Sequence, residues 1–169
     1  MNFKKCMYFV EGSCEEQLIN ALKADPRRIS PGKIKVHNII LEEIPRREVN
    51  MIQAGTTVVF VYDTDVDKTD ILKKNIKHVR EYTSRIKLIH LAQVQNFEDE
   101  IVRSTDVKKA QELTKSKSVR DFKSDFCRMK ITECRNALER HHIDVSRLWV
   151  TKPVGNFTFV EQNGDEIKI

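Results

Sequence analysis

The chain has no long apolar run, no paired-cysteine motif and no glycine-rich nucleotide loop. No stretch of its 169 residues approaches the roughly 20 apolar residues that span a bilayer, so we expect no membrane-spanning helix. Its four cysteines show neither a CxxC pair nor zinc-ligand spacing, which predicts reduced thiols in a cytoplasmic protein. The P-loop pattern GxxxxGK[ST] is absent, so we expect no nucleotide-binding loop of that kind. The first residues lead directly into a predicted strand, so we expect no signal peptide.

The basic charge is concentrated in the later part of the chain. The net charge is +5. Residues 105–152 carry 12 basic and 7 acidic residues, a net charge of +5. Residues 1–104 carry 17 basic and 15 acidic residues (+2), and the last 17 residues carry 1 basic and 3 acidic residues (−2). This excess favours a polyanionic partner such as nucleic acid, although an ordinary solvated helical surface explains it equally well.

Strands and helices alternate through the first part of the sequence. Apolar runs predict strands, and apolar residues at helical spacing predict helices. We expect strands at 5–10, 34–41, 57–62 and 85–91, and helices at 15–24, 67–83 and 97–104, with a short helix opened by Pro45. Such alternation predicts an α/β fold, a mostly parallel sheet of about four strands flanked by helices.

A helical extension is expected to follow this sheet. Helical spacing covers 107–113 and 118–140, and an apolar run at 145–150 suggests another strand. Asn163-Gly164 suits a type I′ turn between strands at 157–160 and 166–169, which predicts a terminal β-hairpin. We therefore expect one domain of 1–169, with a core of about 5–104 and an extension of about 105–169.

Acidic residues follow two of the predicted strands directly. Glu11 and Glu15 come after the first strand, and Asp63 and Asp65 come after the third. Two carboxylates about 4 Å apart repel by roughly 4 kcal/mol at an effective dielectric near 20. A divalent cation would turn that repulsion into binding, so these acids predict a metal site at the carboxyl ends of the strands.

These segments resemble the TOPRIM domain. That family has a hydrophobic strand ending in Glu-Gly and a later strand ending in Asp-x-Asp, as at 9–12 and 61–65 here. The first motif, Glu-Gly-x-x-Glu at 11–15, and Asn96-Phe97-Glu98 resemble the branch of OLD-family nucleases and RloB-like proteins. The resemblance spans roughly 5–104. It implies Mg²⁺-dependent cleavage of DNA or RNA, with Mn²⁺ as a substitute, commonly beside an ATPase partner in defence against phage and mobile DNA.

The resemblance also implies roles for particular residues. One or two ions would be held by a carboxylate set comprising Glu11, Glu15, Asp63, Asp65 and Glu98. Glu11 could instead act as a general acid or base. The catalytic lysine that the family requires is best matched by Lys123, with Lys117 as the runner-up.

Alternative ligands or purely structural roles remain open at several of these positions. Asp99 or Glu100 could replace Glu98 as the ligand, and Asp67 could cap a helix or bind the metal. Cys14 lies near a predicted helix start, where a thiol pKa can fall, but structural packing is the simpler expectation. The whole domain could also be a non-catalytic binding subunit that docks a partner protein or nucleic acid. A receiver-like domain is disfavoured by the early Glu-Gly motif.

Overall fold

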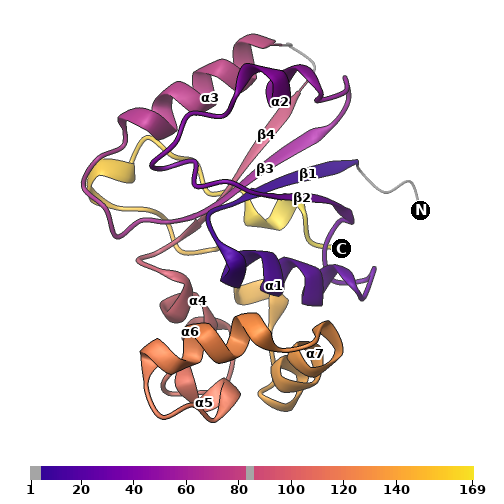
Figure 1. The fold of residues 1–169 in the computed structure, drawn as a ribbon, viewed down its shortest axis with the longest axis vertical. Coiled ribbons are helices and arrows are strands. Elements are labelled where there is room, and N and C mark those ends of the chain that lie inside the picture. Colours follow the sequence, from indigo (N-terminus) through magenta and orange to yellow (C-terminus); the bar gives the residue numbers. More distant parts are fainter. Residues whose placement is uncertain (1–4, 83–85) are drawn as a thin grey trace.

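The computed structural model describes residues 5–82 and 86–169, and it shows a parallel sheet between two helical layers (Figure 1). Its strands are β1 (Cys6–Val10), β2 (Gly32–Val36), β3 (Thr57–Asp63) and β4 (Lys87–Gln93). They pair in the order β2-β1-β3-β4, and every pairing is parallel. The α/β class and the four-stranded sheet predicted from the sequence are therefore confirmed.

Helices cover both faces of this sheet (Figure 1). They are α1 (Ser13–Lys23), α2 (Arg46–Asn50), α3 (Asp70–Tyr82), α4 (Phe97–Ser104), α5 (Gln111–Thr114), α6 (Val119–Arg128) and α7 (Ile131–Arg140). Three 3₁₀ turns follow, at Val145–Arg147, Gly155–Phe157 and Gly164–Glu166. No helix in the described part of the chain is long and apolar enough to cross a membrane.

Alternate residues of β3 enter two separate hydrophobic cores. Val59 and Val61 join the core beneath α1 and the later helices, whereas Phe60 and Tyr62 join the core beneath α2 and α3. This follows from the two-residue period of a strand. With both faces covered, the strand ends remain open to ligands.

Two predicted elements are shorter than the apolar pattern suggested. The second strand ends at Val36 rather than at residue 41, because the Asn38 side chain accepts from the backbone N–H groups of Ile40 and Leu41 (both 3.1 Å) and makes a turn. The helix expected at 118–140 is broken between α6 and α7. There Met129 is extended, and its carbonyl accepts from the Gln17 side chain at 2.6 Å. Residues 83 and 85, which two predicted segments included, lie outside the described residues.

The predicted terminal β-hairpin is wrong. Gly164 begins a 3₁₀ turn, and a Cβ atom there would lie 2.6 Å from the Trp149 carbonyl oxygen. The Gln162 side chain pairs with the Ala92 backbone through bonds of 2.9 and 2.7 Å. The segment therefore packs along β4 instead of folding back on itself. The strand expected at 145–150 is also wrong, because a 3₁₀ turn occupies Val145–Arg147 and Trp149 has φ of 53°.

Candidate active site

The first acidic residues lie where β1 passes into α1. Glu15 is 5% exposed and caps its own helix, since its Oε2 accepts from the Gly12 N–H at 2.9 Å. Burial is the main cause that raises the pKa of Glu15 to about 6, and the charge of Glu11 adds to it. A proton or a cation is therefore favoured beside this buried carboxylate.

Glu11 joins three strands at their carboxyl ends. Its Oε2 accepts from the backbone N–H of Asp63 at 3.0 Å, and its Oε1 accepts from the Asn38 side chain at 3.1 Å. Asn38 follows β2, Glu11 follows β1, and Asp63 ends β3. Burial raises the pKa of Glu11, although these two hydrogen bonds oppose the shift. The carboxylate is thus held in one orientation.

Asp63 has the most perturbed carboxyl group of the site. Burial first, and then the charges of Glu15, Glu11 and Asp65, raise its pKa to about 9. The fully buried Gln93 side chain reaches both Asp63 and Glu15 from the end of β4. With its amide nitrogen turned toward them, Gln93 donates to Asp63 Oδ1 (2.9 Å) and Glu15 Oε1 (3.2 Å).

Lys123 reaches this acidic group from α6. Its Nζ lies 3.1 Å from Glu98 Oε1 at the start of α4. Burial would lower the pKa of Lys123, but the hydrogen bond and charge of Glu98, together with the charge of Asp63, raise it. The other oxygen of Glu98, Oε2, is buried and has no hydrogen-bond partner in the described part of the chain. The lysine is thus fixed as a cation beside an incompletely satisfied carboxylate.

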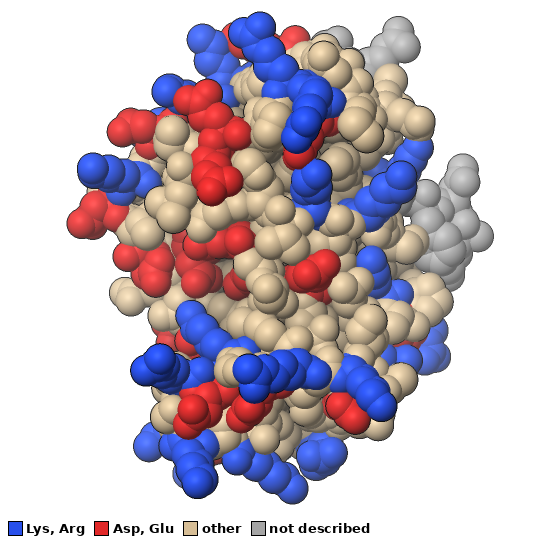
Figure 2. Space-filling model, viewed as in Figure 1, with Lys and Arg blue, Asp and Glu red and all other residues tan. Residues whose placement is uncertain are grey.

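One pocket of about 310 Å³ brings these side chains together. Its wall includes the charged and amide side chains of Glu11, Glu15, Asn38, Asp63 and Lys123. Figure 2 shows acidic side chains gathered on the left of this face, where Figure 1 places the carboxyl ends of the strands, and mostly basic side chains, with some acidic ones among them, over the helical layer below.

The remaining predicted site residues lie outside the pocket wall. Asp65 is exposed and does not line the pocket, and its charge raises the pKa of Glu11 and Asp63. Lys117 is also exposed, before α6, and does not line the pocket. Asp67 is exposed and lies three positions before the first residue of α3, so it is not within the first turn of that helix.

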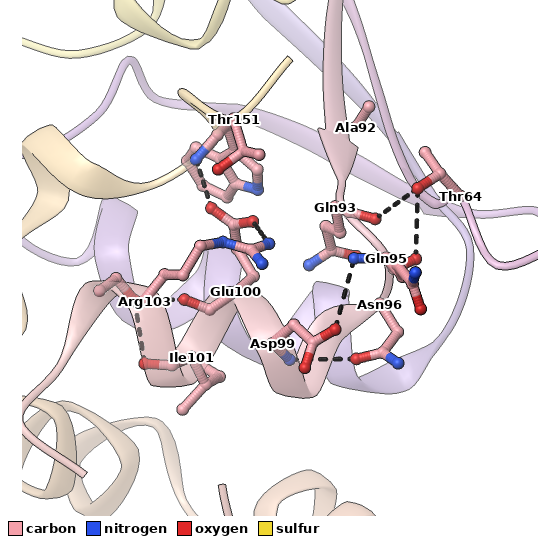
Figure 3. Close-up of polar contacts among 12 residues, drawn as sticks. Thr64, Ala92, Gln93, Gln95, Asn96, Asp99, Glu100, Ile101, Arg103 and Thr151 are labelled. Carbon is pink, nitrogen blue, oxygen red and sulfur yellow. Dashed lines mark hydrogen bonds and ion pairs between the residues drawn. The ribbon is translucent and has the colours of Figure 1, made fainter. Parts of the chain in front are cut away.

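Glu100 faces away from the pocket. Its Oε2 accepts from Arg103 Nη2 at 2.6 Å, and its Oε1 accepts from the backbone N–H of Trp149 (Figure 3). Asp99 accepts from the Gln95 N–H at 3.4 Å, while the Asn96 side chain caps α4 by accepting from the Asp99 N–H. These bonds leave Glu98 as the residue of this acidic run that contacts Lys123.

A polar loop contact fixes the Asp-Thr-Asp segment. Thr64 donates through its hydroxyl to the carbonyls of Gln93 (3.3 Å) and Gln95 (3.4 Å), and its backbone N–H also donates to Gln95 (2.7 Å) (Figure 3). The segment after β3 is thereby joined to the segment between β4 and α4. This contact anchors the backbone between Asp63 and Asp65.

Asn38 and Gln93 are the residues of this site that the sequence analysis missed. Both lie at the carboxyl end of a strand, which is the position that led us to the acids. A search for polar residues of any kind at those ends would have found them.

The carboxylates do not form a ready-made metal cage. Within residues 5–82 and 86–169, no three His, Cys, Asp or Glu side chains are grouped closely enough to hold an ion. These carboxylates are already held by hydrogen bonds from the protein. Glu11 accepts from the Asp63 N–H and the Asn38 side chain, and Glu15 accepts from the Gly12 N–H. Ion binding would require these side chains to exchange protein donors for the cation.

Comparison with known proteins finds no matching family model, no matching curated protein and no matching solved structure. The TOPRIM family thus stays a prediction that the two motifs carry.

Proposed function

We propose that this chain is a Mg²⁺-dependent nuclease of TOPRIM type that hydrolyses phosphodiester bonds of DNA or RNA. The observation that carries the proposal is the convergence of Glu11, Glu15 and Asp63 with Lys123, from distant parts of the chain, in one pocket at the strand ends. Carboxylates that raise one another's pKa are unfavourable for folding, which is typical of functional sites.

The donor set fits a hard divalent cation. All the candidate ligands offer oxygen, which Mg²⁺ prefers. The buried Glu98 Oε2 has no hydrogen-bond partner among the described residues, which leaves an oxygen beside Lys123 unsatisfied. Bound there, Mg²⁺ would activate water and stabilise the leaving oxygen.

Each of the chain's site residues would have a separate role in cleavage. Glu11 and Asp63 would hold the ion together with Glu15, and the charge of the exposed Asp65 would attract it. Lys123 would stabilise the negative charge that develops on the phosphate. The basic helical layer below the pocket would hold the phosphate backbone. The ATPase partner and the defence role are parts of this proposal that come from the family resemblance.

A second candidate is a non-catalytic subunit that docks a partner protein or nucleic acid. The lack of a preformed cage among the described residues favours it, because Glu11 and Glu15 already accept hydrogen bonds from the protein. The two candidates differ in whether removing one acid abolishes a metal-dependent reaction or leaves binding unchanged.

Cleavage of plasmid DNA and of total tRNA tests the proposal. The purified protein would be incubated with each substrate in Mg²⁺, Mn²⁺ or EDTA, beside Asp63→Asn and the exposed control Asp165→Asn. We expect metal-dependent cutting that Asp63→Asn loses and Asp165→Asn keeps. Cutting unaffected by Asp63→Asn would remove the pocket from the mechanism. Equal nucleic-acid binding by both proteins without cutting would favour the binding subunit.

A further inference from the structure

Two cysteines meet beside the acidic pocket. Cys14 lies in the first turn of α1 and Cys127 in the last turn of α6, and their Sγ atoms are 2.8 Å apart. Both line the pocket, and both are half-buried. The sequence analysis gave Cys14 a packing role and did not pair it with Cys127, which lies 113 positions later in the chain.

The geometry suits a covalent link. A disulfide bond is about 2.05 Å long, so the two sulfur atoms need to approach by less than 1 Å to form one. Residues so far apart in sequence close a long loop, and such a link removes much freedom from the unfolded chain. Cys134 competes with Cys14 for this role, since it lies near Cys127 but is fully buried in the helical core.

The link would act on the pocket through two helices. Cys127 is one helical turn after Lys123 on α6, and Cys14 is adjacent to Glu15 on α1. The Cys14 thiol already donates to the Lys123 carbonyl, with a sulfur–oxygen distance of 3.7 Å. A bond between the sulfurs would hold the lysine-bearing helix against the helix that carries Glu15.

We propose that Cys14 and Cys127 form a reversible disulfide that fixes Lys123 over the acidic pocket, so that the site is controlled by thiol oxidation. The bond itself is independent of the nuclease assignment, whereas its effect on cleavage rests on the proposed function. Low-molecular-weight disulfides, such as oxidised glutathione, would supply the oxidant.

The exchange balances with one molecule of oxidised glutathione. One protein thiolate attacks a glutathione sulfur, forms a mixed disulfide and releases the first glutathione thiol. The second protein thiolate then attacks the protein sulfur of that mixed disulfide, forms the Cys14–Cys127 bond and releases the second glutathione thiol. The two protein protons end on the two glutathione molecules. Burial raises the pKa of both cysteines, which makes this exchange slower than at an activated thiol.

Peptide mapping tests the bond directly. The protein would be held in oxidised or reduced glutathione, alkylated, digested without reduction and examined by mass spectrometry. Trypsin cuts after Lys123 and Arg128, which isolates Cys127 from Cys134, and cleavage after Glu11 separates Cys6 from Cys14. We expect a linked Cys14–Cys127 pair in the oxidised sample alone, absent from Cys14→Ser and retained in Cys134→Ala. A Cys127–Cys134 link, glutathione adducts alone or four alkylated thiols would each overturn the proposal.

Thermal unfolding and cleavage test the consequence for the site. We expect oxidation to raise the unfolding midpoint by roughly 5 °C or more, a reductant to reverse the rise, and Cys14→Ser to show none. Cleavage should be at least about threefold faster in the oxidised protein, because Lys123 is held in place. A mapped disulfide that changes neither quantity would refute control of the site. The mapped disulfide could raise the unfolding midpoint while neither the oxidised nor the reduced protein cleaves nucleic acid. That result would contradict the nuclease assignment alone.

Discussion

The backbone N–H of Asp63 donates to Glu11 Oε2 at 3.0 Å, which joins the ends of two neighbouring strands through a carboxylate. The parallel register that pairs Val10 with Val61 brings the two residues together. Protein hydrogen bonds therefore fix Glu11, while Asp63 is left with a carboxyl group that burial and neighbouring acids disfavour as an anion. The two acids of this pair are expected to respond differently to substitution.

Replacing Asp63 should stabilise the metal-free protein while abolishing cleavage. The pKa of Asp63 is raised from 3.8 to about 9, so the folded state keeps a proton that the unfolded state releases. The stability contributed by that proton is present below the unfolded pKa and is lost as the pH rises through the folded pKa. We expect Asp63→Asn to be about 1 kcal/mol more stable than the parent near pH 8 in EDTA, as measured by urea unfolding.

Adding Mg²⁺ to both proteins provides the control for this prediction. Mg²⁺ should raise the free energy of unfolding of the parent protein and leave Asp63→Asn unchanged, because the variant lacks the ligand. A parent protein whose stability is flat between about pH 7 and pH 9 in EDTA, above the range in which His90 acts, would contradict the assigned pKa of Asp63.

Sequence patterns located most of the site because strand ends are local features. The apolar runs before Glu11 and Asp63 identified the strands, and the parallel order brought their carboxyl ends together. Lys123 came from the resemblance, and its contact with Glu98 depends on how α6 packs on α4 through Phe97, Phe122 and Phe126. No local pattern specifies that packing.

The terminal segment shows where local signals mislead. Asn163-Gly164 is a strong turn signal, yet the close approach of Gly164 to Trp149 and the pairing of Gln162 with Ala92 determine its structure. Both contacts are formed with residues distant in sequence. The free energy of tertiary packing therefore outweighs the hairpin preference here.

Glu100 should matter for stability even though it lies outside the pocket. The buried carboxylate accepts from Arg103 and from the Trp149 N–H, so removing it leaves both donors without their partner. We expect Glu100→Ala to lower the free energy of unfolding by about 3 kcal/mol and Glu100→Gln to cost less, since it keeps an acceptor for Trp149. The exposed control Glu81→Ala should cost less than about 0.5 kcal/mol. Equal costs in urea unfolding of both alanine variants would contradict this role.

His90 should make the protein sensitive to mild acid. It is 4% exposed, and its Nδ1 lies 3.2 Å from the Tyr62 hydroxyl. Burial, with a smaller contribution from the charge of Arg80, lowers the pKa of His90 from 6.5 to about 4. The stability that depends on neutral His90 is present above the unfolded pKa and is lost as the pH falls through the folded pKa.

The contribution of neutral His90 should fall by about 3 kcal/mol between pH 6.5 and pH 4. Protonation of Asp63 changes the stability in the opposite direction over this range, so the contribution is measured as the difference in urea unfolding between the parent protein and His90→Gln, which does not titrate. A proton titration of His90 by NMR near its usual pKa of 6.5 would refute the assignment.

Substituting Lys123 and Lys117 in turn tests which of the two is the catalytic lysine. The Nζ of Lys123 lies 3.1 Å from Glu98, and its charge acts on Glu11, Glu15 and Asp63, whereas Lys117 is exposed away from the pocket wall. We expect Lys123→Gln to lower the rate of metal-dependent cleavage by about 100-fold, because the charge that stabilises the phosphate is gone. Lys117→Gln should stay within about twofold. Rates measured at saturating substrate exclude a loss of substrate binding alone, and a larger loss in Lys117→Gln would move the catalytic lysine to the loop before α6.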